Sequence, residues 1–323
     1  MQHRVRPALR WLAPLLLAGL ASGCSVMAGV NFVWNYSRAS DQGTRFYQTY
    51  DHIAKNVSYA DVSDVRLDVY SPPSGKNHPV YIFIHGGGWE SFNKTVFAPL
   101  AMQLVPEEIV VVIPNYTLHP NASYEQMARE VAAAVAWTLE HANEYRGDPG
   151  RVTLSGHSAG GHLSGLVAFD PTYLAEHGYS PSDLCAWVGL SGVYDIELQM
   201  AYEHARGRSW PVMRTVMGGE ENFAHASPVT HVGSGDTVEH AWLVHGAGDE
   251  IIPLSVSEAM ADRLERAGVP MELVVYEDSG HNDYLFEGIS DPDARVLQLI
   301  RRVTQTCYRT NVTDEGASTA EAP

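Results

Sequence analysis

Continuous apolar runs rich in β-branched residues constrain the fold of this chain more than any other feature. The segments VYIFIH (80–85) and IVVVIP (109–114) are of this kind. Such runs are typical of strands buried on both faces of a parallel sheet. Further strands are expected at VRLDVY, VTLSG, AWVGLSG, HAWLVHG and MELVVYE, which occupy residues 65–70, 152–156, 186–192, 240–246 and 271–277.

Helical patterns lie between these runs. Across residues 124–142, apolar side chains recur every three or four positions and form one apolar face. Further helices are expected over 158–170, 255–268 and 293–306. This alternation predicts an α/β fold with a mostly parallel central sheet and helices on both faces.

After its first 23 residues, the chain of 323 residues divides into three parts. Residues 24–60 are aromatic and polar without a clear period, and we expect an N-terminal arm that wraps the protein. Residues 61–307 form the expected catalytic domain. Within it, residues 196–231 interrupt the alternation with helix-like pieces, which predicts a small helical lid above the sheet. Residues 308–323 are a polar tail.

The N-terminus has the pattern of a targeting segment. Three arginines among the first ten residues precede an apolar stretch, 11–20, that is too short to span a bilayer comfortably. The sequence LASGCS (20–25), in which Cys24 is the fifth residue, resembles a bacterial lipobox. We expect residues 1–23 to be a signal peptide and Cys24 to carry a lipid that anchors the exported protein, with Ser25 favouring the outer membrane. An ordinary cleaved signal peptide and an uncleaved anchor are the alternatives.

The net charge narrows the classes of binding partner that we expect. The formal net charge is −17, which argues against nucleic acid or anionic lipid as the main partner.

Besides Cys24, the chain has Cys185 and Cys307. An oxidising compartment would permit a bridge between them, and the sequence leaves open whether they come close enough. No Cys-x-x-Cys or His-rich spacing indicates a metal site, and no cofactor is expected.

Residues 156–160 read Gly-His-Ser-Ala-Gly, a G-x-S-x-G pattern between a predicted strand and a predicted helix. The glycines allow a turn too sharp for bulky side chains. This turn presents Ser158 at the carboxyl edge of the sheet, near a helix N-terminus that favours developing negative charge. Ser158 is therefore the candidate nucleophile.

A glycine-rich segment, HGGGWE (85–90), follows a buried strand. Consecutive glycines are entropically costly, but they let backbone N–H groups approach a substrate closely. The N–H groups of Gly87 and Gly88, together with that of Ala159, are the candidate oxyanion hole. Trp89 is a candidate substrate-binding residue that shapes the pocket.

An acid and a base follow later strands. Asp249 lies just past the strand at 240–246, and the adjacent Glu250 is the alternative acid. His281 lies in the loop after the last predicted strand. The order Ser158, Asp249, His281 is the one expected on an α/β-hydrolase sheet. His281 would take the proton of Ser158, and Asp249 would orient the imidazole ring.

Three further histidines lie beside these elements, and each has a plainer expected role. His85 is expected to brace its loop through a hydrogen bond. His157 and His162 lie too near Ser158 along the chain to reach it in the usual geometry.

From about residue 60 to 305, the chain resembles serine esterases of the α/β-hydrolase fold, in the branch that carries HGGGW and GHSAGGHL. The stretch YRGDPGRVTLSGHSAGGHL is especially similar. This branch includes carboxylesterases, acetyl-xylan-type esterases and kynurenine-formamidase-like enzymes. The resemblance implies a carboxylesterase that hydrolyses small or short-acyl esters through an acyl-enzyme on Ser158. An arylformamidase-like amidase with the same triad and a non-catalytic binding module are the alternatives.

Overall fold

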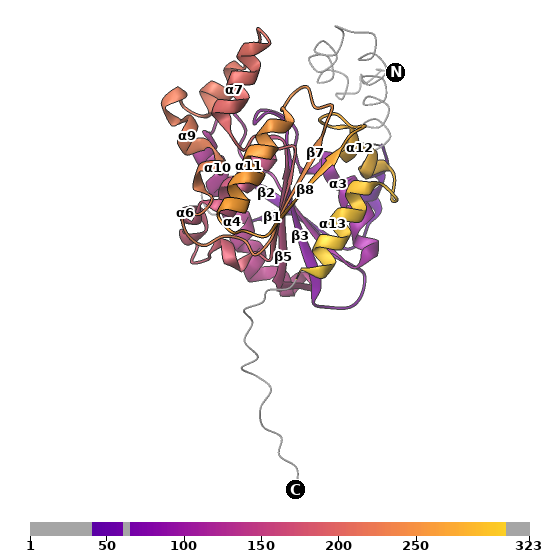
Figure 1. The fold of residues 1–323 in the computed structure, drawn as a ribbon. Coiled ribbons are helices and arrows are strands. Elements are labelled where there is room, and N and C mark those ends of the chain that lie inside the picture. Colours follow the sequence, from indigo (N-terminus) through magenta and orange to yellow (C-terminus); the bar gives the residue numbers. More distant parts are fainter. Residues whose placement is uncertain (1–40, 61–64, 308–323) are drawn as a thin grey trace, which may run out of the picture.

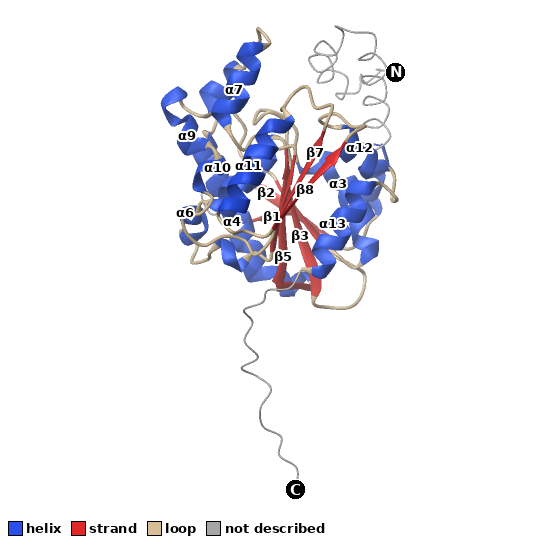
Figure 2. Ribbon diagram, viewed as in Figure 1, coloured by secondary structure: helices blue, strands red, loops and turns tan. Residues whose placement is uncertain are grey.

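The computed structural model describes residues 41–60 and 65–307. Its centre is an eight-stranded sheet with helices on both faces (Figures 1 and 2). The strands are β1 (Ile53–Ser58), β2 (Arg66–Tyr70), β3 (His78–Ile84), β4 (Val110–Pro114), β5 (Gly147–His157), β6 (Ala186–Leu190), β7 (Ala241–Gly246) and β8 (Met271–Tyr276). Their order across the sheet is β1-β2-β4-β3-β5-β6-β7-β8.

Most neighbouring strands run parallel. All pairs from β4 to β8 across the sheet are parallel, whereas β2 pairs antiparallel with both β1 and β4. The carboxyl ends of the parallel strands therefore meet at one edge, where sites form in such sheets. The predicted mostly parallel α/β architecture is confirmed.

The helices connect these strands and lie on the two faces. They are α3 (Ala98–Leu104), α4 (Tyr124–His141), α5 (Ala159–Phe169), α6 (Pro171–Ala175), α7 (Ile196–Ala205), α8 (Pro211–Val216), α9 (Phe223–Ala226), α10 (Pro228–His231), α11 (Leu254–Arg266), α12 (Asp283–Ser290) and α13 (Arg295–Thr306). Figure 2 shows α4 and α11 on one side of the strands and α3, α12 and α13 on the other.

Alternate side chains of each buried strand enter different cores. In β3, Ile82 packs into the core beneath α4, α5 and α11, and Phe83 packs into the core beneath α3 and α13. Both side chains are completely buried. Burial on both faces is why this strand reads as an unbroken apolar run.

The expectation of an N-terminal arm over 24–60 is wrong for its described part. Residues 41–49 are helical, and β1 joins the sheet as an edge strand, so the folded domain begins ahead of residue 61. β1 lacks a readable period for two reasons. It is covered on only part of its surface, and its register shifts between Ala54 and Val57.

The segment GDPGR (147–151) also differs from the expectation. It belongs to β5, because Gly147 pairs with His78 of β3. A register shift between His78 and Val80 accommodates this pairing. The strand therefore begins ahead of the predicted start at residue 152.

The expected lid segment, 196–231, contains the short helices α7 to α10 and no described strand. The predicted signal peptide at 1–23, Cys24 and the tail at 308–323 lie outside the described residues. In residues 41–60 and 65–307, no helix combines the length and apolar character needed to cross a membrane.

Cys185 and Cys307 form a disulfide with a Cα–Cα distance of 5.7 Å. This bond answers the question that the sequence left open. It joins the end of α13 to the residue before β6, so the last helix is tied to the amino-terminal edge of the sheet.

Candidate active site

Ser158 lies on a sharp turn between β5 and α5, with φ 57° and ψ −121°. An L-residue rarely adopts this conformation, and such strain is concentrated at functional sites. A Cβ at Gly160 would collide with the carbonyl oxygen of Ile84, and one at Gly156 would collide with the carbonyl oxygen of Gly160. The glycines thus let α5 approach β3 closely enough to form the turn.

The structure brings the three predicted triad residues together. His281 Nδ1 lies 2.7 Å from Asp249 Oδ2, and His281 Nε2 lies 2.9 Å from Ser158 Oγ. All three residues are buried. Because a carboxylate only accepts, Nδ1 carries the proton that it donates to Asp249, and Nε2 accepts the hydroxyl proton of Ser158. This is the tautomer that a general base requires.

The other carboxyl oxygen of Asp249 fixes the carboxylate in its loop. Asp249 Oδ1 accepts hydrogen bonds from the backbone N–H groups of Ile251 and Ile252, at 2.9 and 2.8 Å. The alternative acid, Glu250, does not face the histidine. Its side chain is 76% exposed and lies 3.9 Å from Arg206. The geometry therefore selects Asp249 over Glu250.

The glycine-rich loop lies beside the nucleophile. A Cβ at Gly86 would be 3.1 Å from Ser158 Cβ. Gly87 and Gly88 follow with φ values of 118° and 62°, which favour glycine. Ala159 is the first residue of α5, so its N–H belongs to the helix N-terminus. The three candidate donors are thus carried by two segments that meet at Ser158.

Comparison with known proteins places this fold and site in a family. The BD-FAE family model matches residues 67–264, which is more than half of the chain. The chain belongs to the BD-FAE family. The matched range includes Ser158, Asp249 and the glycine-rich loop, and it ends before His281.

Curated relatives of this BD-FAE chain are named esterases. The isoprenylcysteine alpha-carbonyl methylesterase ICME of Arabidopsis thaliana is 28% identical over 246 residues, which are 73% of this chain and 58% of that protein. The esterase LipC of Mycobacterium tuberculosis is 30% identical over 274 residues, covering 80% of this chain and 66% of that protein. The chain spans only 53% to 60% of the length of the plant relatives it matches.

Solved structures share the fold. Thermogutta terrifontis esterase 2 matches with a TM-score of 0.64 and 23% identity, covering 77% of this chain and 92% of that one. A truncated carbohydrate esterase from gut microbiota matches with a TM-score of 0.63 and 20% identity, covering 79% of this chain and 96% of that one. The predicted α/β-hydrolase fold is therefore confirmed.

A second histidine, which the sequence analysis missed, contacts the acid. His245 Nε2 lies 3.0 Å from the carbonyl oxygen of Ile252 and 3.4 Å from Asp249 Oδ2. Facing two oxygens, Nε2 must carry the proton, and Nδ1 then accepts from the hydroxyl of Ser257 at 2.8 Å. Burial lowers the pKa of His245, which keeps the ring neutral. The signal for this contact was the histidine four residues before the acid.

The pKa of Asp249 is lowered despite its burial. Burial on its own raises this pKa, because it penalises the charged carboxylate. The neighbouring His281 lowers the pKa through the positive charge that it carries when protonated and through its hydrogen bond, and His245 and the Ile252 N–H lower the pKa further. These contacts together outweigh the burial, so the carboxylate stays charged beside the base.

Trp89 differs from its expected role. Its side chain is completely buried, and its indole Nε1–H donates to His162 Nδ1 at 3.2 Å. The ring also packs against Trp210 at 5.8 Å between centroids. In this structure the buried Trp89 side chain anchors the glycine-rich loop to His162 and Trp210, and it offers no accessible surface to a substrate.

His85 has the bracing role that was expected of it. Its Nδ1 donates to the carbonyl oxygen of Gly86 at 2.8 Å, and its ring stacks on Tyr116 at 4.5 Å. The Tyr116 hydroxyl donates in turn to the carbonyl oxygen of His85 at 2.9 Å. These contacts fix the start of the glycine-rich loop.

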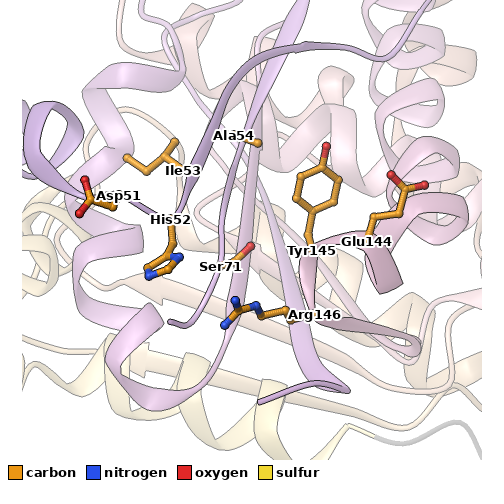
Figure 3. Close-up of a pocket in the computed structure, with 8 residues that line it drawn as sticks. All are labelled: Asp51, His52, Ile53, Ala54, Ser71, Glu144, Tyr145 and Arg146. Carbon is orange, nitrogen blue, oxygen red and sulfur yellow. The ribbon is translucent and has the colours of Figure 1, made fainter. Parts of the chain in front are cut away.

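A cavity of about 220 Å³ lies at the opposite end of the sheet. Residues 51–54, Ser71 and residues 144–146 line it, and Figure 3 shows their side chains. Ser71 follows β2, which runs against β4, and residue 146 precedes β5. The cavity is therefore at the amino ends of the parallel strands, away from the triad.

Proposed function

We propose that the protein is an exported serine carboxylesterase that hydrolyses small or short-acyl esters. The hydrogen-bonded chain from Ser158 through His281 to Asp249 is the observation that carries this proposal. The names of the relatives support it, since they are called methylesterases, esterases and carboxylic ester hydrolases.

The geometry supplies each step of acyl transfer. Ser158 Oγ attacks the ester carbonyl carbon as His281 Nε2 takes the hydroxyl proton. The imidazolium that forms is stabilised by the charged Asp249. His281 then returns the proton to the departing alcohol, which leaves an acyl-enzyme on Ser158. A water molecule attacks the acyl carbon as His281 takes its proton, and His281 then returns this proton to Ser158 Oγ as the carboxylic acid leaves.

The tetrahedral intermediates carry a negative oxygen that needs donors. The N–H groups of Gly87, Gly88 and Ala159 are the proposed donors, and the positive end of α5 adds to their effect. Each such donor typically contributes about 3 kcal/mol to transition-state stabilisation.

Trp210 of the lid segment borders the space beside this loop, which is consistent with a small substrate. A Cβ at Gly88 would have Trp210 Cζ2 of the lid segment as its nearest neighbour, at 3.9 Å. The indole of Trp210 thus bounds the space next to a proposed oxyanion donor. The plant relatives are named for the cleavage of a methyl ester, which is consistent with a small alcohol portion.

Export and lipid anchoring at Cys24 are part of the proposal. The Cys185–Cys307 disulfide supports export, because such bonds persist in oxidising compartments. In cells, Cys24→Ser should move the protein from the membrane fraction to the soluble exported fraction. An unchanged membrane fraction would favour an uncleaved signal anchor.

Hydrolysis of p-nitrophenyl acetate, butyrate, octanoate and palmitate by the purified protein tests the activity. We expect kcat/KM to fall with acyl length, and Ser158→Ala to lower kcat by about 10⁴-fold or more without loss of the folded state. Activity of Ser158→Ala within tenfold of the parent would overturn the assignment of the nucleophile. A preference for N-formylkynurenine over aryl esters would indicate the amidase instead.

A fluorophosphonate probe provides a second, independent readout. Such probes react with an activated serine, and one solved relative in fold is described as phosphorylated by paraoxon. Labelling of the parent and not of Ser158→Ala is the expected result. Absence of labelling in a folded protein would favour a non-catalytic binding module.

A further inference from the structure

His162 joins two segments that are distant from it in the sequence. Its ring is completely buried in α5, four residues after the nucleophile. Nδ1 lies 3.2 Å from the indole Nε1 of Trp89, and Nε2 lies 2.7 Å from the carbonyl oxygen of Ala226. Trp89 ends the glycine-rich loop, and Ala226 ends α9 in the lid segment.

The hydrogen-bond roles of this ring are fixed. The indole N–H can only donate and the backbone carbonyl can only accept, so Nδ1 is the acceptor and Nε2 carries the proton. Burial lowers the pKa of His162 to about 4. The ring is therefore neutral at neutral pH, which is the state that both contacts require.

Trp89 transmits this contact to the glycine-rich loop. Its backbone has φ 63°, its side chain is enclosed, and its carbonyl oxygen accepts from the N–H of His119 at 2.8 Å. Gly87 and Gly88 immediately precede it. A shift of the buried indole would thus displace the two proposed oxyanion donors.

The lid segment also contacts the glycine-rich loop, at Trp89 and Gly88. Trp210 packs on Trp89, and it is also the nearest neighbour of the open side of Gly88. Through Ala226, the ring of His162 holds a second point of this segment. His162 therefore contacts both Trp89, which anchors the glycine-rich loop, and Ala226 of the lid segment.

We infer that His162 is a positioning residue for catalysis: it holds the oxyanion loop through Trp89 and the lid segment through Ala226. This inference rests on the proposed esterase function. The two ring nitrogens then have separate roles. The Nδ1 contact with Trp89 affects the catalytic rate, and the Nε2 contact with Ala226 affects how well the lid segment retains the substrate.

Two conservative substitutions separate these roles. His162→Gln places its terminal group near the Nε2 position and loses the acceptor for Trp89. We expect its kcat to fall about 10- to 100-fold with little change in KM, because misplaced donors act on the transition state. His162→Asn places its terminal group near the Nδ1 position and loses Ala226. We expect a raised KM, with kcat within about twofold of the parent.

A matched pair of tryptophan variants controls for lost packing. Trp89→Phe removes the donor to His162. Trp187→Phe removes a comparable buried donor, because Trp187 Nε1 donates at 3.1 Å to Ser164 Oγ, which lies in α5 as His162 does. Only Trp89→Phe should lower kcat as His162→Gln does. All rates are taken per active site titrated with a fluorophosphonate, so that unfolded molecules do not count.

The outcomes separate the inference from the function on which it rests. If His162→Gln and His162→Asn lower thermal stability alike and leave kcat and KM per titrated site unchanged, His162 is only structural and the inference is wrong. Equal loss of kcat in Trp89→Phe and Trp187→Phe would also overturn it. Activity that persists in Ser158→Ala would instead overturn the proposed function.

Discussion

His157 Nε2 donates to the backbone carbonyl oxygen of His281 at 3.0 Å, so the residue before the nucleophile holds the residue that serves as base. Their rings lie 4.9 Å apart. Burial lowers the pKa of His157 to about 3, and the positive charge that His281 carries when protonated adds to this effect, so the His157 ring remains a neutral donor. The nucleophile turn and the base loop are therefore fixed relative to each other without use of the catalytic nitrogens.

Variants of the adjacent residues Asp249 and Glu250 test which of them is the catalytic acid. Asp249→Asn should lower kcat by about 10⁴-fold, because the amide no longer holds the correct tautomer of His281 or stabilises its charge. Glu250→Gln is the matched control, since the Glu250 side chain is exposed, and it should retain kcat within about twofold. Steady-state kinetics on p-nitrophenyl acetate measures both variants. The reverse order of effects would make Glu250 the acid.

Loss of the second histidine at the acid should have a smaller effect. His245→Phe keeps an aromatic ring and removes the N–H that lies 3.4 Å from Asp249 Oδ2. The hydrogen bond of this N–H goes to the Ile252 carbonyl, and its contact with the carboxylate is electrostatic. Because a neutral hydrogen bond contributes about 1 kcal/mol, we expect kcat/KM to fall about fivefold. The double variant with Ser257→Ala, which also removes the hydroxyl left without its partner, controls for that lost bond. Parent-like kinetics in the double variant would deny His245 a role in catalysis.

Stability should fall in mild acid. Burial lowers the pKa of His85 and His162 to about 4 and that of His157 to about 3, below the value of 6.5 for an exposed ring. The unfolded chain therefore binds protons first as pH falls through about 6.5, and the native state binds them only near pH 4 or below. Between these limits the free energy of unfolding should decrease by about 4 kcal/mol per pH unit for the three rings together.

Urea unfolding at pH 7, 6 and 5 measures this slope. The lowered pKa of Asp249 has the same sign, because its stabilisation is present at higher pH and is lost as pH falls through its folded pKa. That loss occurs below the histidine window. A slope that corresponds to less than one proton between pH 6 and 5 would contradict the buried neutral state of these rings.

The disulfide should contribute to stability and not to catalysis. Cys185 and Cys307 are 122 residues apart, and their bond restricts the unfolded chain. Cys185→Ser with Cys307→Ser should lower the free energy of unfolding by about 2–4 kcal/mol. Because both residues lie toward the amino ends of the strands, kcat per titrated site should be unchanged. A lower kcat with unchanged stability would contradict this division.

The sequence predicted features that depend on local pattern. Unbroken apolar runs located the parallel strands, and the glycines around Ser158 and after His85 marked the two loops that meet at the nucleophile. The order of acid and base followed from their places after β7 and β8. Each of these signals lies within a few residues of the feature that it predicts.

Features that depend on contacts between distant segments were not predictable in this way. The bonds from Trp89 to His162 and from His157 to His281 join residues 73 and 124 positions apart. Which buried histidine faces which partner is decided by the packing of whole elements. Trp89 was misassigned for the same reason, since a tryptophan beside a glycine loop has the same local pattern whether it faces solvent or the core.

The irregularity in β1 has a consequence for the surface of the protein. Lys55 and Asn56 lie in the stretch where the register shifts, both are exposed, and Asn56 has φ 56°. The backbone N–H of Asn56 turns to Asp68 Oδ1 at 2.8 Å. A bulge and a lysine on an outer strand deny another chain a continuous row of donors and acceptors. We therefore expect the β1 edge of the sheet to resist edge-to-edge aggregation even at a high concentration of the protein.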